Sequence, residues 1–169
     1  MNNIVLIGMP SAGKSTLGVV LAKTLGMNFI DTDLVIQQKT GRLLQKIINE
    51  DGIKDFLKIE ENSILSLKVN NTVIATGGSV IFCGKAIEYL KQESIVVYLK
   101  VEFDEIVKRL DNITTRGVVL ATGQNLKDMY NERAPLYEKY SDVIIDCSNK
   151  VVEEIISNVI KEEKLWEKL

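Results

Sequence analysis

Histidine is absent from this 169-residue sequence, and several other residues that carry chemistry are scarce. Without histidine the chain has no Ser/His/Asp triad, no histidine metal ligand and no histidine general base, so proton transfer falls to carboxylates or lysine. The only two cysteines, Cys83 and Cys147, lack CxxC spacing. This argues against a disulfide framework or a zinc site and predicts two buried or partly buried thiols.

Long apolar runs and a strong charge imbalance are also missing. The apolar run at 4–7 is far too short to span a bilayer, and no basic segment precedes an apolar stretch and a cleavage site. The net charge of -2 gives no general attraction to nucleic acid or to an anionic membrane. We therefore expect a cytoplasmic monomer that binds neither nucleic acid nor membrane.

What the sequence does have is a regular alternation of short apolar runs and helical patterns. The composition, 46% hydrophobic and 26% charged, fits one globular domain over residues 1–169. The apolar runs predict strands at 3–8, 28–31, 72–76, 95–99 and 143–146. Because these runs are almost continuously apolar, both faces of each strand should be covered. The pattern predicts a three-layer α/β fold with a five-stranded parallel sheet flanked by helices.

The predicted helices lie between and after these strands. Their ranges are 15–25, 33–39, 43–48, 53–68, 104–110, 125–140 and 150–169. The helices predicted at 43–48 and 53–68 are separated at Asp51-Gly52. The last helix carries an apolar stripe and then becomes charged, so we expect its end to fray.

The stretch "GMPSAGKST" follows the first predicted strand directly. Gly8, four intervening residues and then Gly13-Lys14-Ser15 fit the phosphate-binding loop, in which backbone N–H groups wrap an anion and lysine adds a cation. The alternative is a glycine-rich turn that binds nothing. The strand before it and the helix after it favour nucleotide binding.

Two carboxylates, Asp31 and Asp33, follow the second predicted strand at the edge where parallel sheets place ligands. Residues two apart in extended backbone point the same way. One aspartate is a candidate for a helix cap. Beside a phosphate loop, however, one carboxylate can help Ser15 to hold Mg²⁺ while the other orients an acceptor hydroxyl.

Further candidates follow the third strand and cluster around two arginines. Thr76-Gly77-Gly78-Ser79 is either a simple turn or a place where backbone approaches a ligand closely. The segment 111–124 is either a surface loop or a mobile lid over the nucleotide. Arg116 within it and Arg133 beyond it can neutralise phosphoryl oxygens or a substrate carboxylate. Arg109 has Glu105 four residues earlier on its helix, so we interpret it as structural.

Taken together, these motifs resemble the shikimate kinase family, within the nucleoside monophosphate kinase-like group of phosphate-loop kinases. The resemblance runs from about residue 2 to the final helix. The residues that carry it are "GMPSAGKST", "DTD", the Phe56 to Glu60 pattern F-x-x-x-E, "ATGG", the lid arginine and "RAPLY".

The resemblance implies transfer of the γ-phosphoryl group of MgATP to the 3-hydroxyl of shikimate. It assigns Lys14, Asp33 and Arg116 to catalysis, and Ser15 and Asp31 to Mg²⁺. The residues it implies for ATP are Gly8, Ser11, Ala12, Gly13, Lys14, Ser15, Thr16 and Arg116, with the backbone near Cys147 and Lys150 at the adenine. The acceptor positions are Asp33, Leu57, Gly77, Gly78, Ser79 and Arg133, of which Arg133 meets the carboxylate.

The sequence departs from the family pattern at acceptor positions. Leu57 stands where the family pattern has arginine, and Ser79 where it has a third glycine. Lys54 shares a helix face with Leu57 and can offer a point charge, without the two-pronged geometry of arginine. The alternatives to shikimate are another small hydroxy acid, a sugar acid such as gluconate, or an ATP-binding module that transfers nothing.

Overall fold

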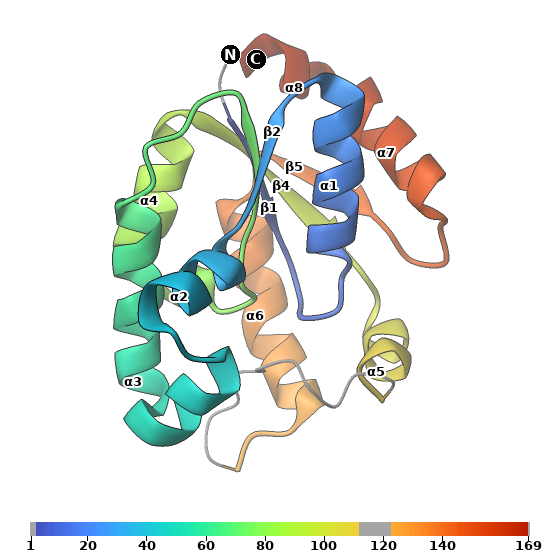
Figure 1. The fold of residues 1–169 in the computed structure, drawn as a ribbon. Coiled ribbons are helices and arrows are strands. Elements are labelled where there is room, and N and C mark those ends of the chain that lie inside the picture. The colour runs from blue at the N-terminus through green and yellow to red at the C-terminus, as the bar shows by residue number, and fades with distance from the viewer. Residues whose placement is uncertain (1–2, 112–122, 169) are drawn as a thin grey trace.

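The computed structural model describes residues 3–111 and 123–168, and its centre is a five-stranded parallel sheet (Figure 1). The strand order is β2-β3-β1-β4-β5, and every neighbouring pair is parallel. The strands are β1 (Asn3–Ile7), β2 (Asn28–Asp31), β3 (Thr72–Ala75), β4 (Ser94–Lys100) and β5 (Val143–Asp146). The predicted α/β fold with five parallel strands is confirmed.

Helices cover both faces of the sheet. α1 (Lys14–Leu25) and α7 (Val152–Lys161) pack together on one side, whereas α4 (Gly84–Gln92) and α6 (Leu126–Tyr140) pack on β4 from the other (Figure 1). The remaining elements are α2 (Thr32–Thr40), α3 (Leu44–Leu65), the 3₁₀ turn η1 (Val80–Phe82), α5 (Phe103–Asp111) and α8 (Glu163–Lys168). Among the described residues, no helix is long and apolar enough to cross a membrane.

The central strand β1 shows why these short apolar runs form a sheet. Its residues from Ile4 to Ile7 have no exposed surface, because β3 and β4 flank the strand and helices cover both faces. A separate small apolar cluster of Ile36, Ile47 and Phe56 joins α2 to α3. That cluster holds the segment after β2 against the main body of the fold.

The strand order places the loops that matter at one edge of the sheet. The chain leaves β1 toward α1 on one face and leaves β3 toward α4 on the other, so the two neighbouring strands diverge at their carboxyl ends (Figure 1). Ligands of α/β proteins bind in such a crevice. β2 lies beside β3 and brings Asp31 to the same edge.

Two parts of the fold differ from the sequence expectation. η1 and α4 occupy residues for which no element was predicted. The predicted break at Asp51-Gly52 is confirmed, because Gly52 (φ 81°, ψ 168°) is non-helical and forms a kink between two helical halves of α3. The predicted terminal helix is two helices, α7 and α8, and Leu165 of α8 is fully buried. Most of the predicted lid, including Arg116, lies in 112–122, outside the described residues.

Candidate active site

The loop between β1 and α1 has the backbone geometry of an anion cradle. Gly8 has φ 147°, and a Cβ added there would lie 2.8 Å from the carbonyl oxygen of Leu99. Only glycine fits such a close approach. Gly13 has φ 94° immediately before α1, and Ser11 has φ 65° within the loop. The first N–H groups of α1 have no partner inside the helix, so they face this loop as hydrogen-bond donors.

Lys14 lies inside the same loop. Its side-chain Nζ donates to the carbonyl oxygens of Gly8 at 2.8 Å and Met9 at 2.7 Å, and the residue is 8% exposed. Holding a nearly buried ammonium group requires such partners. The loop therefore positions a cation at the point on which its backbone donors converge.

Asp31 connects the phosphate loop to the segment after β2. Its Oδ2 accepts a hydrogen bond from the Ser15 hydroxyl at 2.6 Å, and its Oδ1 accepts one from the Asp33 N–H at 2.9 Å. Asp31 is thus the N-cap of α2 and also a partner of Ser15. The helix-cap alternative is therefore confirmed, and Asp31 also lies beside Ser15, the residue with which it is predicted to hold Mg²⁺.

Ser15 and Asp31 also make a suitable pair of oxygen ligands for a small hard cation. The described residues contain no group of three or more acidic, cysteine or histidine side chains that could hold a metal ion. Mg²⁺ in phosphoryl-transfer sites takes one or two protein oxygens and completes its shell with phosphate and water. The residues therefore fit a Mg²⁺ that is held together with a nucleotide.

Arg109 supports the phosphate loop from α5. It pairs with Glu105 one turn earlier, as the sequence predicts. In addition, its Nη1 donates to the carbonyl oxygen of Ser11 at 3.2 Å. This bond joins residues 98 positions apart, and it fixes the loop from the side opposite Asp31.

The turn after β3 is packed so tightly that it excludes side chains. A Cβ on Gly77 would lie 2.5 Å from Glu60 Oε1 and 2.9 Å from Asp33 Oδ1. A Cβ on Gly78 would lie 3.0 Å from Pro10 of the phosphate loop. The Gly77 N–H donates to the Thr32 hydroxyl at 3.2 Å. The paired glycines let β3, α2 and the phosphate loop meet.

Glu60 lies behind this turn and is fully buried. Its Oε2 accepts from the Ser79 hydroxyl at 2.6 Å, and the Cys83 thiol lies 3.7 Å from the same oxygen. No described residue offers a hydrogen bond to Oε1. Burial raises the pKa of Glu60 from its ordinary 4.5 to about 7, and nearby Asp33 raises it further, whereas Ser79 and Arg133 oppose the shift.

Arg133 approaches the same turn from α6. The side chain is only 2% exposed, and its guanidinium lies over the ring of Phe82 at 5.4 Å. Its Nη1 lies 3.3 Å from the point that a Cβ on Gly78 would occupy. One turn later on α6, the Tyr137 hydroxyl donates to the Gly78 carbonyl at 2.6 Å. Arg133 thus brings a buried positive charge beside the glycine pair.

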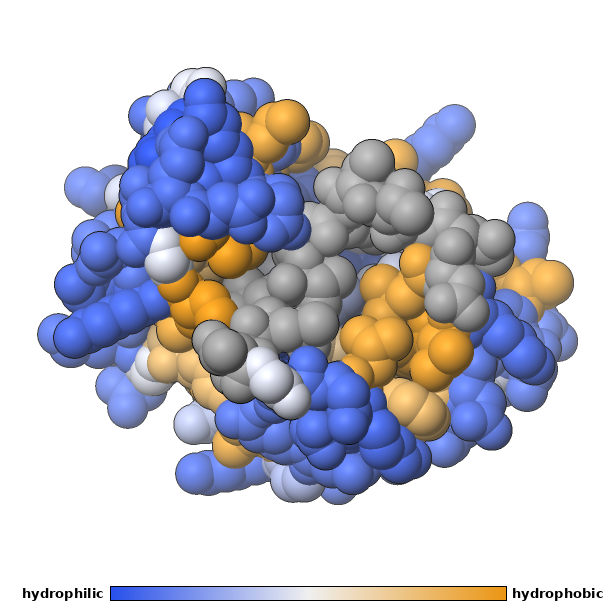
Figure 2. All heavy atoms as spheres, turned by 90° about the horizontal axis from the view of Figure 1, so that it is seen from below, coloured by the Kyte–Doolittle hydropathy of each residue, from blue (hydrophilic) through white to orange (hydrophobic). Residues whose placement is uncertain are grey.

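These elements surround a cavity of about 380 Å³ at the carboxyl edge of the sheet. Seven of the residues predicted for the site line it: Ser11, Gly13, Lys14, Ser15, Asp31, Asp33 and Gly78. The opposite wall is partly apolar and comes from the segment around α2, with Leu34, Leu43 and Leu44. Viewed from this end of the molecule, apolar side chains gather within a hydrophilic surround (Figure 2).

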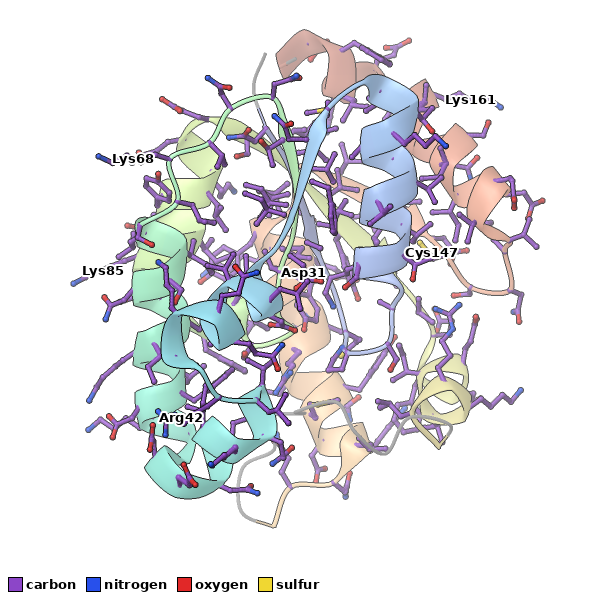
Figure 3. The ribbon with its side chains drawn as sticks, in the orientation of Figure 1. Asp31, Arg42, Lys68, Lys85, Cys147 and Lys161 are labelled. Carbon is purple, nitrogen blue, oxygen red and sulfur yellow. The ribbon has the colours of Figure 1, made fainter. Side chains whose placement is uncertain are left out.

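Other predicted positions do not line this cavity. Leu57 is partly buried and packs against both apolar clusters. Cys147 is fully buried, as both cysteines are, and its N–H donates to the Lys100 carbonyl. In Figure 3, Asp31 and Cys147 lie on opposite sides of the base of α1. Lys150 donates to the Asp146 carbonyl at 2.7 Å. The backbone predicted to meet adenine therefore lies beyond the phosphate loop, away from Asp33.

Three residues that hold the site together have no predicted role: Thr32, Glu60 and Tyr137. Each makes a hydrogen bond with a residue of the turn after β3: Thr32 with Gly77, Glu60 with Ser79 and Tyr137 with Gly78. Only Glu60 carries a signal in the sequence. It lies four residues after Phe56 and four before Ile64, so an acidic residue occupies the apolar face of α3.

Comparison with known proteins identifies close relatives along nearly the whole chain. The shikimate kinase family matches residues 10–164. A shikimate kinase of Thermodesulfovibrio yellowstonii is 36% identical over 165 residues, which cover 96% of this chain and 95% of that protein. A shikimate kinase of Caldanaerobacter subterraneus is 32% identical over 164 residues, covering 95% of each.

Solved structures give the same result. The shikimate kinase of Acinetobacter baumannii, in complex with shikimate, has a TM-score of 0.90 and 31% identity, with 100% of this chain and 96% of that chain covered. The Aquifex aeolicus shikimate kinase has a TM-score of 0.79 and 28% identity, with 94% of each chain covered. A gluconokinase of Sinorhizobium meliloti has a TM-score of 0.54 at 18% identity and covers 92% of this chain and 87% of its own, which shows a shared fold alone.

The burial of Glu60 makes stability depend on pH in a specific window. Below pH 4.5 the carboxyl is protonated in both the folded and the unfolded chain. Between pH 4.5 and about 7 the unfolded chain loses this proton and the folded chain keeps it, so the free energy of unfolding falls as pH rises. The loss reaches about 3 kcal/mol above pH 7. Glu60→Gln cannot ionise and avoids it.

We therefore compare the Tm of Glu60→Gln with that of the unsubstituted chain at pH 5 and at pH 8. We expect the Tm difference in favour of Glu60→Gln to be larger at pH 8 than at pH 5 by roughly 5 to 10 °C. Differential scanning calorimetry at both pH values measures the gain. Glu61→Gln, which removes a partly exposed carboxylate from the same helix, is the matched control. A Tm difference for Glu60→Gln that is the same at pH 5 and pH 8 would contradict the assignment.

Proposed function

The chain belongs to the shikimate kinase family, and on this basis we propose that it transfers the γ-phosphoryl group of ATP to the 3-hydroxyl of shikimate. Membership makes it an ATP-dependent phosphotransferase with an alcohol group as acceptor, in the shikimate pathway of aromatic amino acid biosynthesis. The observation that carries the proposal is that Lys14 of the phosphate loop and Asp33 after β2 line one cavity. A phosphate donor and a hydroxyl acceptor can meet there.

The phosphate loop supports the donor half of the proposal. The backbone N–H groups from Gly8 to Thr16 are proposed to surround the phosphates of ATP. Lys14, now held by two loop carbonyls, exchanges them for phosphate oxygens. Its charge then follows the β- and γ-phosphates as negative charge moves between them in the transition state. Arg116, which lies outside the described residues, is proposed to meet the phosphates from the lid.

Ser15 and Asp31 are the residues proposed to hold Mg²⁺. Their oxygens are already adjacent, since one hydrogen-bonds to the other at 2.6 Å. When bound, Mg²⁺ neutralises charge that develops on the transferring phosphoryl group. The Asp33 N–H donates to the Asp31 carboxylate and holds the two acidic residues in a fixed relation. Asp31 therefore positions both the proposed Mg²⁺ site and the proposed acceptor site.

Asp33 is proposed to orient the acceptor hydroxyl and receive its proton. Its Oδ1 lies next to Gly77. Asp33 and Gly78 both line the cavity beside the phosphate loop. The backbone of the glycine pair can approach the acceptor because it carries no Cβ. Arg133, buried beside Gly78, is proposed to bind the shikimate carboxylate. Leu57 contributes apolar packing where the family pattern has an arginine.

No observation favours the alternatives. The gluconokinase neighbour shares the fold alone. An ATP-binding module without transferase activity is a poor fit to a site in which Asp33, Lys14 and the Ser15–Asp31 pair all lie along one cavity. The remaining proposal for the backbone near Cys147 and Lys150 is that it contacts adenine, beyond the phosphate loop.

The direct test of the function is ADP production with MgATP in the presence and absence of shikimate. We expect shikimate to stimulate ADP production, and gluconate to do so far less. Lys14→Met should fold, keep its Tm within a few degrees, and lose most of the activity because the migrating charge is no longer followed by a cation. No stimulation by shikimate, or full activity in Lys14→Met, would contradict the proposal.

The two aspartates should fail in different ways when each is replaced by asparagine. Asp33→Asn should still bind MgATP while phosphoryl transfer falls by 10²-fold or more, on the order of the loss of a general base. Asp31→Asn should raise the Mg²⁺ concentration needed for half-maximal activity, because it weakens an oxygen ligand. Nucleotide binding by fluorescence and Mg²⁺ titration of the rate measure these effects. A larger change of Mg²⁺ dependence in Asp33→Asn would mean that the two roles are exchanged.

A further inference from the structure

The two places where the sequence departs from the family pattern meet at one side chain. Ser79 donates its hydroxyl to Glu60 Oε2 at 2.6 Å. Leu57 lies three residues before Glu60 on α3, so the two side chains are neighbours on the helix surface. Positions 57 and 79 are 22 residues apart in the chain, yet Ser79 bonds to Glu60 and Leu57 lies one helical turn before it.

Glu60 needs a hydrogen-bond donor because it is fully buried. Leaving a buried carboxyl oxygen without a partner costs the desolvation energy of that group. Ser79 supplies the short bond to Oε2, and the Cys83 thiol adds a weak one at 3.7 Å. Titratable and charged groups around Glu60 come from α2, the end of η1 and α6, namely Asp33, Cys83, Arg133 and Tyr137. Among these contacts, the hydroxyl of Ser79 is the strong donor.

The side chain at position 57 decides whether this donor is required. Leu57 is apolar, packs against both clusters of the core, and offers Glu60 nothing. A guanidinium on the same helix face would bring several N–H donors and a positive charge to the carboxyl. We infer that Leu57 and Ser79 form one coupled feature, in which the Ser79 hydroxyl holds Glu60 because position 57 carries no cation.

Glu60 in turn positions the acceptor side of the cavity. Its Oε1 lies against Gly77. Both Glu60 Oε1 and Asp33 Oδ1 are within 3 Å of the point that a Cβ on Gly77 would occupy. The next residue, Gly78, lines the cavity and is fixed through its carbonyl by Tyr137. A shift of Glu60 therefore moves the glycine pair relative to Asp33. Ser79 is a positioning residue for the acceptor, and it acts through Glu60.

This inference rests on the proposed function for its kinetic test. The experiment compares Ser79→Ala, Leu57→Arg and the double substitution, with Ser79→Thr as the variant that keeps the hydroxyl. Ser94→Ala is the matched control, since Ser94 is a buried serine at the start of β4, at the other end of the sheet. Steady-state rates give kcat and the KM values for shikimate and ATP separately.

Ser79→Ala should lower kcat/KM for shikimate about tenfold, as expected for loss of a hydrogen bond to a carboxyl group. The KM for ATP should change less than about twofold, because the phosphate loop is untouched. Ser79→Thr should stay within about threefold of the unsubstituted chain, and Ser94→Ala should be silent. In the Leu57→Arg background the penalty of Ser79→Ala should shrink below about threefold.

An equal penalty for Ser79→Ala in both backgrounds would overturn the inference, and so would an equal rise of both KM values. The Tm of the same four chains is a readout that does not depend on the substrate, and it should show the same non-additivity. If the unsubstituted chain does not use shikimate, the proposed function fails and the Tm cycle still decides the coupling. If Leu57→Arg does not fold, Leu57→Lys supplies the cation at position 57, and the same comparison with Ser79→Ala decides the coupling.

Discussion

The buried carboxyl of Glu60 is the constraint on which the acceptor side of this site depends. It lies on the apolar face of α3, and the only strong hydrogen bond described for it comes from Ser79. Its other oxygen, Oε1, lies only 2.5 Å from the point that a Cβ on Gly77 would occupy. The chain therefore needs glycine at that point, and the closeness of Asp33 on the other side raises the energy of placing a second negative charge there. A neutral Glu60 satisfies both conditions.

The donor side of the site is built on a different principle. Its loop is shaped by positive φ values at Gly8, Ser11 and Gly13, and its lysine is held by backbone carbonyls. Asp31 connects the two sides, since one oxygen meets Ser15 and the other caps α2. Asp31 thus connects Ser15, its proposed partner at Mg²⁺, to the start of α2, where Asp33 lies. This coupling suits an enzyme that must bring a phosphoryl group and a hydroxyl into line.

Local patterns in the sequence are sufficient for most of the fold and for the position of the glycine-rich loop after β1. The five strands were predicted from apolar runs, and the phosphate loop from the spacing of Gly8, Gly13 and Lys14. The helix Gly84–Gln92 was missed although Ala86, Ile87 and Leu90 are buried, because Cys83 before it provides no side-chain cap to signal a start. Contacts between distant residues had no local signal. The bond from Ser79 to Glu60 and the bond from Arg109 to the Ser11 carbonyl depend on how helices pack around the sheet.

The most direct test of this account is the titration of the Glu60 carboxyl itself. NMR of the chain labelled with ¹³C at glutamate side-chain carboxyls follows its ionisation, and the resonance that is missing in Glu60→Gln identifies it. The account predicts a midpoint near pH 7, well above the ordinary value of 4.5, because the folded chain holds this carboxyl buried and neutral beside Asp33. A midpoint near 4.5 would contradict it, since the folded chain would then carry Glu60 ionised at neutral pH.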